Sequence, residues 1–74
     1  MIKISVPRVD GSSQDWTETD GVYSRYLKLR SSGYKGKSLV HELLTDDWGA
    51  PPVGVRLTGT LEDGTPVDEY IPYS

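Results

Sequence analysis

The chain has 74 residues, five tyrosines, two tryptophans and no phenylalanine or cysteine, and its net charge is −3. A chain of this length forms one small domain with a thin hydrophobic core. The absence of cysteine excludes a disulfide framework and a zinc site with thiolate ligands. We therefore expect a single domain over residues 1–74, stabilised by aromatic and aliphatic packing or by association with another chain.

The first apolar segment alternates in the manner of a half-buried strand. Residues 2–6 carry apolar side chains at every second position, and Pro7 ends the pattern. The stretch that follows is rich in Gly, Ser, Asp and Thr, so we expect residues 7–20 to form a long, mobile loop. Trp16 lies in the middle of this stretch, and the sequence leaves open whether it packs on the core or contacts a partner.

Two helices are expected in the middle of the chain. Residues 22–30 place several large side chains on one helical face, although a strand is an alternative because Tyr and Val favour strands. Asp20 is the candidate N-cap of this helix, and Gly33 the candidate residue at its end. Residues 38–46 carry a stripe of Leu and Val, with Ser38 as N-cap, and the sequence Gly-Ala-Pro-Pro follows.

The C-terminal third is expected to form a β-hairpin. Residues 53–61 place Val, Leu and Gly on one alternating face, and Glu-Asp-Gly at 62–64 is a strong turn signal. The returning strand contains Pro66 and Pro72, which cannot donate ladder hydrogen bonds, so we expect it at a sheet edge. The order β-α-α-β-β predicts an α+β fold, a three-stranded antiparallel sheet with one or two helices packed on one face.

The sequence Gly36-Lys37-Ser38 matches the last three residues of a phosphate-binding P-loop. That motif also requires a glycine five residues before Gly36, where this chain has Ser31, and a buried apolar strand before it. Residues 26–30 carry too many charges for such a strand. We interpret the segment as a turn between two helices and expect no nucleotide or other cofactor.

Charge is distributed unevenly along the chain. Residues 25–37 carry five basic side chains and no acidic one, which leaves a net charge of −8 for the rest. Tyrosines alternate with these cations, so the segment suits an acidic protein surface or single-stranded nucleic acid, or it is an ordinary solvated helix face. The candidate partner-binding residues are Arg25, Tyr26, Lys28, Arg30, Tyr34, Lys35, Lys37 and, in the preceding loop, Trp16.

Residues 26–44 resemble a helix-turn-helix, and the turn at 62–65 would then be the wing of a winged-helix DNA-binding domain. That resemblance implies contacts with nucleic acid. The helix that would read the DNA carries Glu42, Asp46 and Asp47, however, and the wing tip is acidic too. These carboxylates would be repelled by phosphates.

Residues 55–69 resemble, locally, a strand-turn-strand segment of FKBP-type prolyl isomerases. The resemblance implies that Asp68 corresponds to a pocket aspartate, whereas Leu57 stands where that family has a pocket tyrosine. We interpret the match as a shared hairpin. The single histidine, His41, has no neighbours at a recognised metal-ligand or catalytic spacing. We therefore expect neither an enzyme nor a metal site.

The function that these features favour is a small non-enzymatic interaction protein. It would act as an inhibitor, adaptor or accessory factor on a larger protein with an acidic surface patch, in the style of short phage and mobile-element proteins. The alternative is a nucleic-acid-binding module of winged-helix-like order that uses residues 23–37. A homodimer through the edge at residues 67–71 is a further expectation. The sequence predicts no membrane segment or signal peptide, so we expect a cytoplasmic protein.

Overall fold

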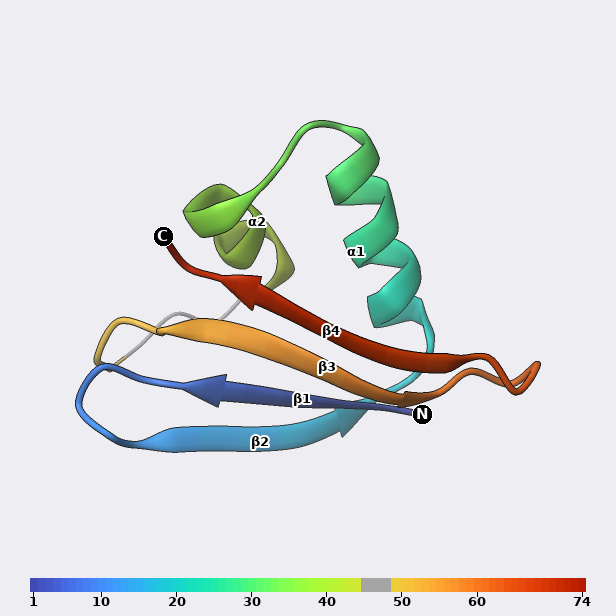
Figure 1. Cartoon of the computed structure of the whole chain (residues 1–74), viewed down its shortest axis with the longest axis horizontal. Coiled ribbons are helices and arrows are strands. Elements are labelled where there is room, and N and C mark those ends of the chain that lie inside the picture. The colour runs from blue at the N-terminus through green and yellow to red at the C-terminus, as the bar shows by residue number, and fades with distance from the viewer. Residues whose placement is uncertain (45–48) are drawn as a thin grey trace.

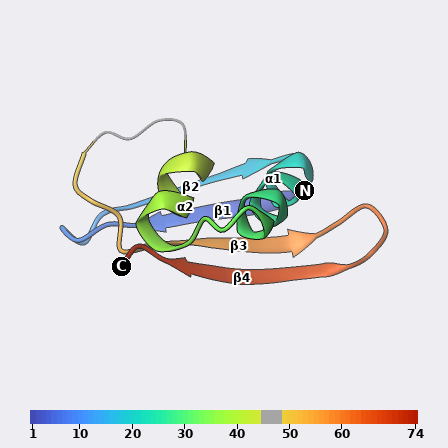
Figure 2. The ribbon, with the colours of Figure 1, turned by 90° about the horizontal axis from the view of Figure 1, so that it is seen from above.

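The chain folds into a four-stranded antiparallel sheet with two helices on one of its faces (Figure 1). The computed structural model describes residues 1–44 and 49–74. The sheet order is β2-β1-β3-β4, and the view from above shows both helices over the sheet, with β2 and β4 at its two edges (Figure 2). The elements are β1 (Ile2–Pro7), β2 (Ser13–Glu18), α1 (Gly21–Ser31), α2 (Gly36–Leu43), β3 (Gly54–Thr60) and β4 (Pro66–Pro72).

The predicted α+β class is confirmed, but the predicted number of three strands is wrong. The fourth strand, β2, lies inside the segment that was expected to be a loop, residues 7–20. It pairs with β1 through the register Ile2↔Glu18 to Pro7↔Ser13. Most of its side chains are exposed. The sequence of β2 therefore lacks the alternation of apolar and polar residues that identifies a half-buried strand. Ladder hydrogen bonds to β1 hold this edge strand. Trp16 is the one large apolar side chain of β2, and it packs partly against the core.

The turn between β1 and β2 is stabilised by short polar contacts. The Asp10 carboxylate accepts hydrogen bonds from the Ser12 N–H at 2.9 Å and the Ser12 hydroxyl at 2.6 Å. These two bonds hold the pKa of Asp10 below its usual value, and the bond from the Ser12 hydroxyl has the larger effect. Gly11 between them has a φ of 88°, which glycine adopts without steric cost. The composition that predicted a loop therefore describes the turn correctly and the following strand wrongly.

The predicted C-terminal hairpin is confirmed. Val55 and Leu57 of β3 and Val67 and Ile71 of β4 face the helices and are buried. Strand β4 is at the sheet edge, as its prolines predicted. Val53 departs from the predicted face, because its side chain is exposed outside β3.

A β-bulge explains the exposure of Val53. The pairs Ser5↔Arg56 and Arg8↔Pro52 enclose two residues on the β1 side and three on the β3 side. The extra residue interrupts the alternation of β3 against β1. Val55 is buried in the core, and Gly54 is buried because the Tyr70 ring covers it.

Helix α1 agrees with the helical interpretation of residues 22–30 and excludes the strand alternative. Its end is the predicted glycine cap: Gly33, with a φ of 96°, donates to the Arg30 carbonyl, and Tyr34 donates to the Leu29 carbonyl. This pair of bonds is a Schellman motif. At the other end, the side chain of Asp20 makes no hydrogen bond to the helix and accepts the N–H of Glu62 at 2.9 Å instead.

Helix α2 is shorter and begins earlier than predicted. Lys35 is its N-cap, so the assignment of Ser38 as N-cap is wrong. The Ser38 hydroxyl lies inside the first turn and donates to the Lys35 carbonyl at 2.9 Å. The helix ends at Leu43 because Leu44 is already extended. Residues 45 and 46 of the predicted helix lie outside the described residues.

The core is a single layer between the sheet and the helices. The predicted α2 stripe is confirmed, since three of its four residues are buried and Leu44 is partly buried. The opposite sheet face is open and largely polar, with Lys3, Arg56 and Tyr70 exposed. None of the described helices is long and apolar enough to cross a bilayer. The buried hydrophobic residues of this core are Ile2, Ile4, Val6, Val22, Tyr26, Leu39, Val40, Leu43, Val55, Leu57, Val67 and Ile71.

Replacement of Gly54 by alanine is expected to destabilise the fold by about 1–3 kcal/mol, the usual cost of overpacking. An added Cβ would lie 2.7 Å from the Ile71 carbonyl oxygen and would overlap the Tyr70 hydroxyl. Urea denaturation of Gly54→Ala measures this cost. Gly21→Ala is the matched control, since its Cβ meets only the Thr19 hydroxyl oxygen at 3.7 Å. Equal midpoints for the two variants would contradict the prediction.

The charge of Asp20 is expected to stabilise the fold at neutral pH and to lose this effect in acid. The Glu62 N–H, followed by the chain's amino group 3.1 Å away, holds the Asp20 pKa below its usual value. With a depressed folded pKa, the stabilisation is present above the unfolded pKa of about 3.9 and disappears as pH falls through the folded pKa. Thermal unfolding of Asp20→Asn should therefore show a lower Tm than the parent at neutral pH, with the difference closing between about pH 5 and pH 2. A constant difference over that range would contradict this account.

Candidate functional site

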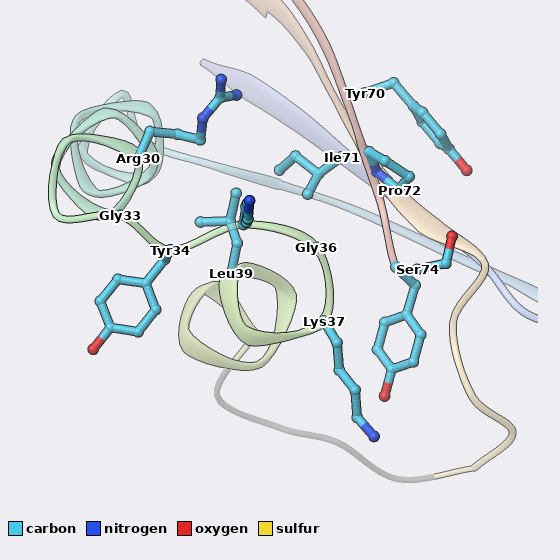
Figure 3. A pocket seen from close by; sticks show the side chains of 12 residues that line it. Arg30, Gly33, Tyr34, Gly36, Lys37, Leu39, Tyr70, Ile71, Pro72 and Ser74 are labelled. Atoms are coloured by element: carbon cyan, nitrogen blue, oxygen red, sulfur yellow. The ribbon is translucent and has the colours of Figure 1, made fainter.

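A groove lies between the α1–α2 turn and the end of β4. It has a volume of about 990 Å³ and is open to solvent. Figure 3 shows Arg30 and Tyr34 on the helix side of the groove, Tyr70 and Pro72 on the strand side, and Leu39 between them. Segments that are distant in the sequence therefore form one surface. We call it the basic groove, defined by Arg30, Tyr34, Lys35, Lys37, Tyr70, Ile71, Pro72 and Tyr73.

Three cations line the basic groove, and no acidic side chain among the described residues does. Arg30 donates to the hydroxyl oxygen of Tyr26 at 2.7 Å, which fixes its guanidinium near the helix. The Lys37 ammonium lies 5.9 Å from the centre of the Tyr73 ring, within cation–π range. Lys35 has no ion-pair partner in the described part of the chain. The positive charge of the groove is thus left for a ligand.

Tyrosine side chains supply the rest of the lining. Tyr34 is 37% exposed and offers ring surface to a ligand, whereas the ring of Tyr70 lies on the far side of β4 from Arg30 and Tyr34 (Figure 3). The Tyr70 ring packs over Gly54 and lies 5.7 Å from the Arg56 guanidinium. Rings with a polar tip and two rotatable bonds are common anchors in protein interfaces, because little entropy is lost when they bind.

Tyr73 is held against helix α2. Its hydroxyl lies 2.8 Å from His41 Nε2, and the two rings stack with centroids 5.7 Å apart. A smaller hollow of about 450 Å³ continues from the groove along α2 and is lined by Tyr34, Lys37, Ser38, His41 and Glu42. At this end, the surface carries the carboxylate of Glu42.

Local sequence explains how the α1–α2 turn reaches β4. Gly33 ends α1 in the left-handed conformation and reverses the chain, and Gly36 begins α2 with a φ of 56°. A Cβ on Gly36 would lie 3.4 Å from the Ser74 carbonyl oxygen, so the turn backbone approaches the end of the chain closely. Both glycines are needed for this approach. Gly36-Lys37-Ser38 follows a helix rather than a strand, as the helix-turn interpretation predicted.

The structure brings together four of the eight predicted partner-binding residues: Arg30, Tyr34, Lys35 and Lys37 all line the groove. Arg25 has another role. It donates to the Leu43 carbonyl at 2.8 Å and so ties α1 to the last turn of α2. The free carbonyls at a helix C-terminus are the groups that such a cation stabilises.

Tyr26, Lys28 and Trp16 also lie outside the groove. Tyr26 is 2% exposed, a core residue whose pKa is raised by burial. Lys28 is exposed on α1 but does not line the groove. Trp16 lies on β2, at the other sheet edge, packs partly against the core, and donates from Nε1 to Glu18 at 2.8 Å. Of the two roles that the sequence left open for Trp16, the structure shows packing on the core.

Sequence reasoning missed Tyr70, Pro72 and Tyr73 as part of the site. Their alternation identified a strand, but nothing local places that strand beside residues 34–37. The described residues contain no cluster of three or more His, Cys, Asp or Glu side chains that could hold a metal ion. Comparison with protein-family models, curated proteins and solved structures finds no match to this chain.

Loss of the Arg25 side chain is expected to affect stability rather than binding. Arg25→Ala should lower the free energy of unfolding by roughly 1 kcal/mol, because a charged hydrogen bond to the Leu43 carbonyl is lost. Lys28→Ala, on the same helix, should change it by less than about 0.5 kcal/mol. Guanidinium denaturation of both variants distinguishes the two roles, and indistinguishable unfolding curves would return Arg25 to the candidate binding residues.

Proposed function

We propose that this chain is a small interaction module that binds an acidic segment of a larger protein in the basic groove. The observation that carries the proposal is the convergence of Arg30, Lys35 and Lys37 in a groove with no acidic lining residue. A cationic, tyrosine-lined groove complements carboxylates on a partner and steers their approach. Binding would cover the partner's own site, as an inhibitor, adaptor or accessory factor does.

The groove favours binding over catalysis. It is open along its length and lined by cations and tyrosines, with no carboxylate to act as a general base. Catalysis generally requires a site that excludes water around the reacting groups. A cationic groove requires only that the ligand displace water from its charges and rings.

A compact acidic segment fits better than a strand of nucleic acid. A phosphate backbone continues beyond any one groove, and here it would meet Glu42 along α2 or Glu69 on β4. Negative charge on both continuations weakens binding to a polyanion but leaves room for a short acidic peptide. In the winged-helix alternative, α2 would read the bases, and Glu42 on its exposed side again disfavours this.

A charge-reversal experiment tests the proposal. Lys35→Glu with Lys37→Glu reverses two groove cations, and Lys3→Glu with Lys28→Glu makes the same change in net charge outside the groove. Both pairs are exposed, so both variants should keep the parent circular dichroism spectrum. Affinity capture from nuclease-treated lysate should then retain one stoichiometric protein with the parent and the control, and at least about tenfold less with the groove variant, the effect of one lost charge contact.

Two results would contradict the proposal. Equal capture by the groove variant and the control would mean that another surface binds the partner. Retention of nuclease-sensitive material alone, with a steep dependence on salt, would support the nucleic-acid alternative.

A further inference from the structure

The outer side of β4 offers unpaired backbone groups beside the basic groove. In an antiparallel pair, alternate residues exchange both hydrogen bonds with the neighbouring strand, and the residues between them point their backbone groups outward. Tyr73 donates to the Val53 carbonyl at 3.0 Å, and Thr65 accepts from the Leu61 N–H at 2.8 Å. With the register Val55↔Ile71, these bonds assign the odd-numbered residues of β4 to β3.

The backbone N–H and carbonyl groups of the even-numbered β4 residues therefore point away from β3, toward solvent at the sheet edge. Two of the four are Pro66 and Pro72, which have no N–H to leave unpaired. Asp68 and Tyr70 between them have free N–H groups, and all four have outward carbonyls. The prolines thus limit the accessible edge to a short stretch with two donors at its centre.

We propose that an extended acidic segment of the partner protein adds to β4 as a fifth strand, pairing with the backbone of Asp68 and Tyr70. This inference rests on the proposed function of the basic groove and specifies the form of its ligand. Strand addition to an open sheet edge takes its affinity from main-chain hydrogen bonds and its specificity from alternate side chains. β4 supplies both features, because the same strand lines the groove.

Side-chain alternation defines the residues that the added strand should carry. Every second side chain would point toward the helix side of the sheet, where Arg30, Lys35 and Lys37 line the groove. A carboxylate is favoured beside Ile71, where β4 lines the groove, and a neutral side chain is favoured beside Glu69, because like charges on neighbouring strands repel. The intervening side chains would point toward the open face, where the Asp68 carboxylate is 2.8 Å from Arg56. Neutral residues are favoured there, since Arg56 is already paired.

A second copy of this chain is a weaker candidate for the same edge. Its β4 would present Val67, Glu69 and Ile71 toward the groove, which is one carboxylate for three cations. A homodimer through β4 is therefore an outcome that the experiment must distinguish from the proposed acidic ligand.

The test uses Asp68→Pro, with Asp68→Asn as its control. Both variants lose the exposed ion pair with Arg56, but only proline removes the outward N–H. Because that N–H makes no bond within the sheet, proline should leave the fold intact, as the natural prolines at 66 and 72 do. If Asp68→Pro fails to fold, a synthetic chain with an ester in place of the Tyr70 amide removes one outward N–H without a ring.

The ligand probe is a displayed library of random heptapeptides selected on the immobilised parent protein. Selected sequences should carry Asp or Glu at the end of the peptide that lies beside Ile71 and the groove cations, and a neutral residue beside Glu69. A synthetic copy should bind Asp68→Asn within about threefold of the parent and Asp68→Pro at least about tenfold more weakly. The amides of Asp68 and Tyr70 should exchange hydrogen rapidly in the free protein and slowly with peptide bound, whereas Glu69 should be protected in both.

Four results would overturn the inference. The selection yields no acidic peptide, or Asp68→Pro binds peptide as well as Asp68→Asn does. The bound peptide protects the amides of β2 instead of those of β4, or the amides of Asp68 and Tyr70 become protected without peptide as protein concentration rises. The last identifies a second copy as the occupant. The strand-addition inference can fail without the proposed function failing. If lysate capture is lost with Lys35→Glu, Lys37→Glu but kept with Asp68→Pro, the groove binds the partner and strand addition is excluded.

Discussion

Twelve buried apolar side chains meet between one face of the sheet and the two helices, and the described residues form no second core. Burial of that one face is the main favourable term available to so short a chain. It uses the apolar sides of β1, β3, β4, α1 and α2 and leaves the opposite sheet face and both edges uncovered. The basic groove lies where this layer ends, at the margin between the α1–α2 turn and β4.

The parts of the fold that could be predicted are those whose burial leaves a periodic signal. The stripe of α2 and the alternation of β3 and β4 follow directly from contact with the core. β2 could not be recognised, because an edge strand with exposed side chains has the composition of a loop, and its pairing with β1 is a backbone property. The cap at Gly33 was predictable, since a glycine just after a helical pattern commonly adopts the left-handed conformation that ends the helix.

The candidate site was predictable only in part, for a similar reason. A run of cations marks a charged segment, but the helical turn assigns its members to different environments. Tyr26 is in the core, and the Arg25 side chain binds the last turn of α2, while Arg30 and Lys37 line the groove. The groove's other wall comes from residues some 35 positions later in the chain. Only the tertiary arrangement of α1, α2 and β4 brings Tyr70 and Tyr73 opposite that segment.

The two prolines of β4 have a consequence for the protein in concentrated solution. The sheet has two unlike edges, β4 beside the cations and β2 with Asp15 and Glu18. Opposite charges on opposite edges favour head-to-tail stacking of many copies, and contacts of that kind extend into fibres rather than closing. Pro66 and Pro72 interrupt the β4 template after two donors, too short a length to propagate a continuous sheet. The prolines therefore oppose polymerisation through β4, while the N–H groups of Asp68 and Tyr70 stay accessible at that edge.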